Sequence, residues 1–321
     1  MPASPGAGPV SVPESSPGAP GWWRLEMACP AELEESLLWK LQSLGIPRVA
    51  VRHRPEIPQL KELLAWLPEI DWPEPQRQAL ERALAPLGEP FGLALPPLRW
   101  QQQGEEDWSL SWKRHWQADP VGERLLILPA WLELPPEYAE RLVIRMDPGS
   151  AFGTGSHPTT RLCLEVLEGL AATGSGLAGL QVADLGSGSG VLALAALRLG
   201  AASVVASDTD PLAVRASGDN ARLNGLNLTV AQGSVEALAE LLAGRPADLL
   251  LCNILAPVIE ALAPAFSQVL AADGLGLLSG LLVDQAPALI RALAAVGWQG
   301  ELTASQDPWG LMTIRRSGTV A

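Results

Sequence analysis

The stretch from Val182 to Gly200, "VADLGSGSGVLALAALRLG", decides the fold of this chain. An apolar run enters a loop that contains Gly186, Gly188 and Gly190, and an alanine- and leucine-rich segment follows. This succession predicts a buried β-strand, a tight loop and an α-helix. The glycines permit positive φ angles and let a ligand approach the loop backbone without a clash with Cβ atoms.

The sequence after this loop alternates strand and helix patterns. Nearly continuous apolar strand patterns lie at residues 180–186, 202–208, 228–234, 247–254 and 274–282. Helical patterns lie at residues 190–200, 210–225 and 256–272. Buried strands separated by helices indicate a Rossmann-like, mostly parallel sheet covered on both faces. The last two strand patterns, 298–306 and 309–317, have no helix between them, so the seven-stranded sheet is expected to end in an antiparallel hairpin.

The first third of the chain has a different pattern. Residues 1–20 are rich in Pro, Gly, Ser and Ala and predict a disordered tail. Residues 21–104 predict a small α+β domain, ferredoxin-like in layout. Its strand patterns lie at 22–28, 48–54 and 91–101, and its helical patterns at 31–45, 57–67 and 74–88. Residues 105–123 predict a linker helix with Trp108, Trp112 and Trp116 on one face, and residues 124–321 the catalytic domain.

Composition and charge limit the kinds of molecule that the chain is expected to bind. The chain has 22 basic and 35 acidic residues, a net charge of −13, which opposes binding to a nucleic acid backbone. No apolar run is long enough to span a membrane, and a signal peptide is not evident. The three cysteines have no metal-ligand spacing, so no metal site is expected and the thiols are predicted to be reduced and buried. These features predict a cytoplasmic protein.

The loop and the strand after it indicate the cofactor. The glycine spacing G-x-G-x-G differs from the dinucleotide-binding pattern G-x-G-x-x-G and from the P-loop. Asp208 ends the next predicted strand, where a carboxylate can bind both hydroxyls of a ribose. Together they favour an adenosine ligand with a small zwitterion at its other end, a description that S-adenosylmethionine fits. The sequence therefore favours a class I methyltransferase over an NAD-dependent enzyme.

Asn253 ends the strand pattern at 247–254, and two interpretations of it stay open. At the carboxyl end of a parallel strand, its carbonyl oxygen could orient an amine nucleophile. Alternatively, it forms an Asx-turn or the N-cap of the helix that begins near Ala256.

Four segments also resemble a known family. "DPGSAFGTGSHPTTRLCLEVLE" at 147–168, the loop segment already quoted, "ASDTDPLAV…NARLNG" within 206–225 and "DLLLCNILAPVIE" at 248–260 are similar to the bacterial methyltransferases of large-subunit ribosomal protein eleven. The resemblance runs from about Glu105 to the end of the chain. It implies S-adenosylmethionine-dependent methylation of lysine side chains and of the N-terminal α-amine of that protein. It also implies that the small N-terminal domain, residues 21–104, recognises the substrate and that a flexible linker joins it to the catalytic domain.

The resemblance also implies site residues. By motif position, cofactor contacts fall on Thr160, Gly186, Asp208 and Asn253, and Gly188 belongs to the same loop. Departures from the family pattern are small: Ser187 stands where Cys or Thr is frequent, and Thr209 where an aliphatic residue is usual.

The stretch 147–160 is expected to form a lid over the cofactor, with Thr160 reaching the ligand from the following helix. His157 could act in the site or serve as a turn and helix-start residue.

Two other functions remain open from the sequence. One is a class I methyltransferase for another amine substrate, although the N-P-P-[YF] motif of glutamine and adenine methylators is absent, because Ile254 and Leu255 follow Asn253. The other is a non-catalytic adenosylmethionine-binding protein of ribosome assembly.

Overall fold

The computed structural model describes residues 21–46, 48–54, 57–103, 116–147, 155 and 157–318. The chain divides into two compact units. One contains Met1–Cys29 and Arg48–His115, and the other contains Pro30–Pro47 and Trp116–Ala321. The units are described separately below. The tail predicted at residues 1–20 lies outside the described residues.

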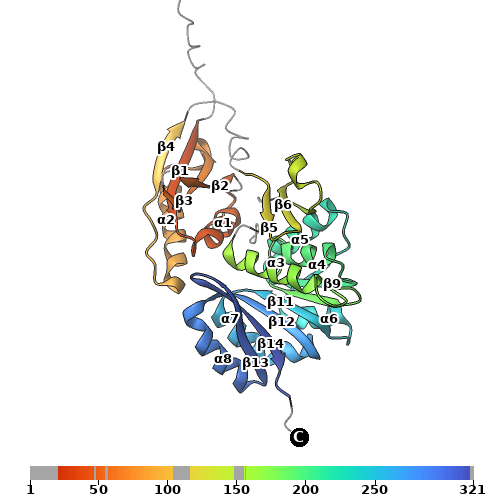
Figure 1. Ribbon diagram of the computed structural model, residues 1–321. Helices are drawn as coiled ribbons and strands as arrows, with labels where there is room; N and C mark the ends of the chain where they lie inside the picture. Colours follow the sequence, from red (N-terminus) through yellow and green to blue (C-terminus); the bar gives the residue numbers. More distant parts are fainter. Residues whose placement is uncertain are drawn as a thin grey trace, which may run out of the picture. The chain divides into compact units, whose positions relative to one another are not determined.

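The larger unit is built on a seven-stranded sheet with the order β10-β9-β8-β11-β12-β14-β13 (Figure 1). The strands are β8 (Gln181–Leu185), β9 (Ser203–Asp208), β10 (Thr229–Gln232), β11 (Ala247–Asn253), β12 (Leu270–Leu282), β13 (Trp298–Gln306) and β14 (Trp309–Arg316). The first five pair in parallel, whereas β14 is antiparallel to both β12 and β13. The predicted α/β class and its antiparallel terminal hairpin are therefore confirmed.

Helices lie on both sides of this sheet, with α3 on the opposite side from α7 and α8 (Figure 1). They are α3 (Pro158–Ala171), α4 (Val191–Arg198), α5 (Pro211–Leu223), α6 (Val235–Leu242), α7 (Ala256–Leu262) and α8 (Ala286–Ala295). Apolar residues of α6, α7 and α8 share one buried cluster with the sheet, in which the rings of Phe266 and Trp298 meet edge to face at 6.3 Å. Cys29, Cys163 and Cys252 are buried and form no disulfide, as expected.

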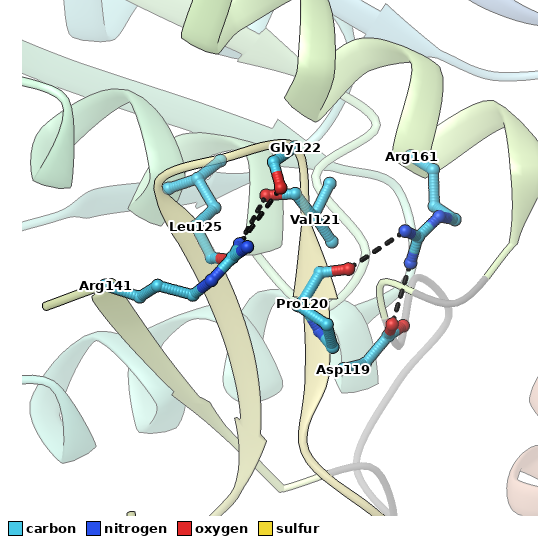
Figure 2. A network of polar contacts seen from close by, with 7 residues as sticks. All are labelled: Asp119, Pro120, Val121, Gly122, Leu125, Arg141 and Arg161. Carbon is cyan, nitrogen blue, oxygen red and sulfur yellow. Dashed lines mark hydrogen bonds and ion pairs between the residues drawn. The ribbon is translucent and has the colours of Figure 1, made fainter. Parts of the chain in front are cut away.

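A three-stranded sheet precedes α3, formed by β5 (Asp119–Val121), β6 (Leu125–Pro129) and β7 (Leu142–Met146). Figure 2 shows how two arginines hold it. Arg161 of α3 donates to the carboxylate of Asp119 at 2.8 Å and to the Pro120 carbonyl at 3.0 Å. Arg141 donates to three backbone carbonyls, those of Val121, Gly122 and Leu125.

This small sheet corrects part of the predicted linker helix at 105–123. Residues 104–115, with Trp108 and Trp112, lie outside the described part of the chain, but residues 119–121 form a strand and not a helix. Pro120 lacks the amide hydrogen that a helix would need, and the ladder between β5 and β6 supplies other backbone partners.

The smaller unit contains a four-stranded antiparallel sheet with the order β2-β3-β1-β4. Its strands are β1 (Trp22–Cys29), β2 (Val49–Arg54), β3 (Ile57–Pro68) and β4 (Arg99–Gln103), and its helix is α2 (Glu74–Leu84). The ferredoxin-like layout stays a prediction, because α1 (Glu34–Ser43) groups with the larger unit.

Two predicted elements of this unit are wrong. Residues 57–67 form strand β3 and not a helix, because the segment pairs on both edges, with β1 and with β2. Its consecutive residues Leu63 to Leu67 are all buried, so the side chains of both strand faces are covered. The strand expected at 91–101 begins only at Arg99, after Pro96 and Pro97, which lack the amide hydrogen that a ladder needs.

Candidate functional site

A pocket opens where the strand order of the large sheet reverses, at the carboxyl ends of β8 and β11. This is the place where open α/β sheets bind ligands. The pocket has a volume of about 250 Å³ including its opening to solvent. Its lining residues are Thr160, Gly186, Ser187, Gly188, Val191, Leu192 and Asn253. The structure thus brings together four of the five residues expected to form the site.

The three glycines of the loop between β8 and α4 have different roles. Gly186 has a φ of +76°, and a Cβ atom there would lie 2.5 Å from Cγ2 of Ile254. Gly188 has a φ of +54° and lines the pocket as well. Gly190 instead packs on α5, since its Cβ would lie 3.0 Å from the hydroxyl oxygen of Ser217. The first two glycines therefore shape the pocket, and the third permits close helix packing.

Asp208, the fifth expected site residue, is connected to the pocket through the loop. One oxygen of its carboxylate accepts a hydrogen bond from the Gly188 amide at 2.8 Å, and the other accepts from the Asp210 amide at 2.9 Å. Burial raises the pKa of Asp208, and these backbone hydrogen bonds oppose that rise. The carboxylate ends β9 beside the glycine loop.

Asn253 and Thr160 meet across the pocket. The side-chain amide nitrogen of Asn253 donates to the hydroxyl oxygen of Thr160 at 3.2 Å. The amide oxygen of Asn253 is buried, and within the described residues it has no hydrogen-bond partner. The alternative interpretation of Asn253 as the helix N-cap is wrong, because Leu255 occupies the N-cap of α7. The unpaired amide oxygen of Asn253 is the acceptor that a bound ligand would satisfy.

Asp184 lies beneath the glycine loop, 1% exposed. One carboxylate oxygen accepts from the Ala193 amide at 3.1 Å near the start of α4. The other oxygen is buried with no hydrogen-bond partner among the residues that the structure describes. Burial raises the pKa of this carboxyl from 3.8 to about 7, and the charge of Asp208 adds to the effect.

His157 is the N-cap of α3. Its Nδ1 accepts from the Thr159 amide at 3.3 Å, and the ring packs edge to face on Trp309 at 4.8 Å. With Nδ1 as acceptor, Nε2 carries the proton and donates to the Ala31 carbonyl at 3.0 Å. The ring is 4% exposed. These contacts favour the helix-start role over a direct role in the site.

The lid expected at 147–160 falls largely on residues that the structure does not describe, namely 148–154 and 156. Asp147, Gly155 and residues 157–160 are described. In the same described part of the chain, no cluster of three His, Cys, Asp or Glu side chains could hold a metal ion, and no helix is long and apolar enough to cross a membrane.

Sequence reasoning missed two pocket residues, Val191 and Leu192 in the first turn of α4. Their position directly after Gly190 is a usable signal, because the helix that follows such a loop begins at the ligand. Sequence reasoning also assigned no role to Ser217 and Asn220, two buried polar residues of α5. A polar pair three positions apart in a segment rich in alanine was the signal available for these.

Comparison with known proteins places these features in a family. Residues 21–317 match the family "Ribosomal protein L11 methyltransferase (PrmA)". A ribosomal protein L11 methyltransferase of Synechococcus sp. (strain RCC307) is 65% identical over 300 residues, which cover 93% of this chain and 98% of that protein. Another, of Prochlorococcus marinus (strain MIT 9303), is 59% identical over 298 residues, 92% of this chain and 97% of that protein. The crystal structure of a ribosomal protein L11 methylase from Lactobacillus delbrueckii subsp. bulgaricus aligns with a TM-score of 0.55 at 34% identity, covering 63% of this chain and 100% of that one.

Proposed function

The chain belongs to the ribosomal protein L11 methyltransferase family, and we propose that it transfers methyl groups from S-adenosylmethionine to amino groups of ribosomal protein L11. One observation carries the proposal for the site. At the carboxyl ends of β8 and β11, the glycine loop, Thr160 and the unpaired amide oxygen of Asn253 line one pocket.

The residues of this pocket fit the cofactor. Gly186 and Gly188 leave the loop backbone open to a close ligand. Asp208 stands at the end of β9, where its carboxylate would hold the ribose hydroxyls. The unpaired amide oxygen of Asn253 gives the pocket an acceptor for a group bound next to the cofactor. When bound, S-adenosylmethionine supplies a methyl group that the sulfonium already activates.

The task left to the protein is to align a neutral amine with that methyl group. A lysine ammonium has a pKa of about 10.4 and must lose a proton before it can act as a nucleophile. Removal from water favours the neutral form, and the proton leaves to solvent. The amide oxygen of Asn253 accepts a hydrogen bond from the neutral amine, while its amide nitrogen stays tied to Thr160. This bond fixes the orientation of the carboxamide, so Asn253 serves as the residue that orients the nucleophile.

The substrate side of the proposal follows the predicted domain organisation. Residues 21–104 recognise the ribosomal protein, and the part of the predicted linker that precedes β5 connects the two domains. The remainder of the chain holds the cofactor and the reacting amine. The net charge of −13 favours a basic protein partner over a nucleic acid. With this substrate, the chain works in the cytoplasm.

The test is a labelling experiment. The protein is incubated with S-adenosylmethionine that carries a labelled methyl group and with ribosomal proteins from a strain that lacks this methylation. Label in L11 alone, mapped by mass spectrometry to lysine side chains and the N-terminal amine, is the expected result. Label in another band would indicate another amine substrate. Cofactor binding without any labelled band would indicate a non-catalytic binding protein.

A further inference from the structure

Helix α5 contacts two separate parts of the larger unit through side chains on one stretch, Ser217 to Asn224. One part is the end of β7, and the other is the glycine loop before α4. Asn220 is the residue that contacts both. Its amide oxygen accepts from the Asp147 amide at 3.1 Å, and its amide nitrogen donates to the Ser189 carbonyl at 2.9 Å. The side chain is 1% exposed.

The contact with β7 has a regular geometry. Asn224 accepts from the Arg145 amide at 2.8 Å and donates to the Arg145 carbonyl at 2.7 Å, so its carboxamide pairs with the strand edge as another strand would. Four residues of a helix rise about 6 Å, and two residues of a strand rise about 6.6 Å. The spacing of Asn220 and Asn224 therefore matches that of Asp147 and Arg145. Helix α5 runs antiparallel to β7, along the edge of β7 that faces away from β6.

The contact with the loop involves the carbonyl groups of Gly188 and Ser189. The hydroxyl of Ser217 donates to the Gly188 carbonyl at 2.9 Å, next to the Asn220 bond to Ser189. The amide of Gly188 is bound on its other side by Asp208. Gly188 lines the pocket. Asp208 binds its amide group and Ser217 of α5 binds its carbonyl group.

We propose that Asn220 is a positioning residue for the cofactor loop, because its carboxamide joins the end of β7 at Asp147 to the loop at Ser189. Asp147 is the first residue of the stretch 147–160, one of the segments that resemble the family. A single side chain thus connects the start of that stretch to the glycine loop. The nature of the ligand rests on the proposed function, whereas the connection itself is a property of the larger unit.

Three alanine variants separate the two contacts. Asn224→Ala removes the contact with β7, together with side-chain bonds to the Asn220 carbonyl and to Arg198, and leaves the loop contacts in place. Ser217→Ala removes contacts with the loop only. Asn220→Ala removes the side-chain bonds to both β7 and the loop. Dissociation constants for S-adenosylmethionine and for S-adenosylhomocysteine are measured by calorimetry, and melting temperatures by circular dichroism. For Asn220→Ala we expect both affinities to fall about tenfold, as for the loss of a buried hydrogen bond. Ser217→Ala should lose affinity in the same direction. Asn224→Ala should melt earlier than the parent chain while its affinities stay within about twofold of the parent's, a change worth less than one hydrogen bond.

A kinetic readout distinguishes positioning from a general loss of structure. In Asn220→Ala the KM for S-adenosylmethionine should rise about tenfold, in line with one lost hydrogen bond, while kcat at saturating cofactor stays close to that of the parent chain. Asn220→Asp is the second variant, in case Asn220→Ala does not fold. It keeps the acceptor for the Asp147 amide and loses the donor to Ser189, so it too should bind the cofactor less tightly.

Two results would overturn the inference. One is parental cofactor affinity in a folded Asn220→Ala or Asn220→Asp. The other is an affinity loss in Asn224→Ala as large as that in Asn220→Ala, because the effect would then come from the β7 edge alone. Failure of the parent chain to bind S-adenosylmethionine would instead refute the proposed function, so the two failures are distinguishable.

Discussion

The side-chain amide of Asn253 donates to the hydroxyl of Thr160 across 3.2 Å, which leaves the opposite oxygen of the same carboxamide unpaired in the pocket. Asn253→Ala removes that oxygen and should lower kcat about a hundredfold, the scale of effect when a reacting group loses its alignment. Steady-state kinetics with L11 check this.

Two substitutions of Thr160 test the same hydrogen bond from its other partner. Thr160→Val keeps the shape of the side chain but frees the carboxamide to rotate, so kcat should fall, whereas Thr160→Ser retains the hydroxyl and should stay close to the parent chain. Full turnover in Asn253→Ala would remove this residue from the reaction.

Asp208 should determine cofactor affinity and not the rate of the chemical step. Asp208→Ala removes the acceptor of the Gly188 amide as well as the proposed ribose contact, so S-adenosylmethionine should bind at least tenfold more weakly, as expected for about 1.4 kcal/mol or more. Calorimetry gives the dissociation constant. Undiminished affinity in a folded variant would contradict the ribose assignment.

Asp184 makes the stability of the ligand-free chain depend on pH. Burial raises the pKa of this carboxyl from 3.8 to about 7. The folded chain therefore favours the protonated form. Protonation of Asp184 therefore contributes its full share to the free energy of unfolding below about pH 4, and this contribution is lost as the pH rises to about 7. Each unit of difference between the folded and unfolded pKa corresponds to about 1.4 kcal/mol.

Asp184→Asn should remove this loss. The free energy of unfolding of the variant, relative to the parent chain, should increase between pH of about 4 and 7 and then level off. Urea unfolding of both chains at a series of pH values measures the difference. Curves that run parallel over this window would show that Asp184 does not titrate there.

Gly280 should not tolerate a side chain, because it lies against the backbone of Ile254, the residue that follows Asn253. It has a φ of +83°, and a Cβ atom would lie 2.4 Å from the carbonyl oxygen of Ile254. Gly280→Ala must therefore shift the backbone that follows Asn253, and kcat should fall together with stability. Gly297→Ala is the control, since that glycine has a φ of +88° and open space around it.

The control variant should lose about 1–2 kcal/mol from the strained φ alone and keep the turnover of the parent chain. Kinetics and denaturant unfolding of both variants compare the two effects. Equal kinetic behaviour of the two would mean that the Ile254 contact has no bearing on catalysis.

His157 should matter for stability more than for chemistry. His157→Ala removes the N-cap of α3 and should lower the free energy of unfolding by at least about 1 kcal/mol. His157→Asn restores a capping side chain and should recover much of that loss. Both variants should keep kcat at saturating substrates. A stable His157→Asn without turnover would place this histidine in the reaction.

The sequence predicted the catalytic fold well because its strands are buried on both faces and each ends in a distinct signal. The glycines after β8, Asp208 as the last residue of β9 and Asn253 as the last residue of β11 mark three strand ends at one edge of the sheet. The carboxyl ends of parallel strands lie at one edge of a sheet, so the residue pattern alone is enough to predict that these signals surround one ligand site.

The N-terminal part was harder because local pattern and pairing disagree there. Leu60, Leu63, Leu64 and Leu67 have the spacing of a helix face, yet they belong to β3, which pairs on both edges. A short apolar run reads as helix or strand alike when both strand faces are buried. The bridge made by Asn220 was also beyond sequence reasoning, because its partners, Asp147 and Ser189, depend on how α5 lies against β7.

The place of β14 in the sheet has a consequence for synthesis of the chain. This strand follows the other six strands of its sheet in the chain, yet it lies between β12 and β13, and its Trp309 packs against His157 at the start of α3. A nascent chain that lacks residues 309–316 has a gap between β12 and β13, and the ring of His157 lacks its contact with Trp309. Folding during translation therefore cannot complete this sheet, or the packing at the start of α3, before residues 309–316 have left the ribosome.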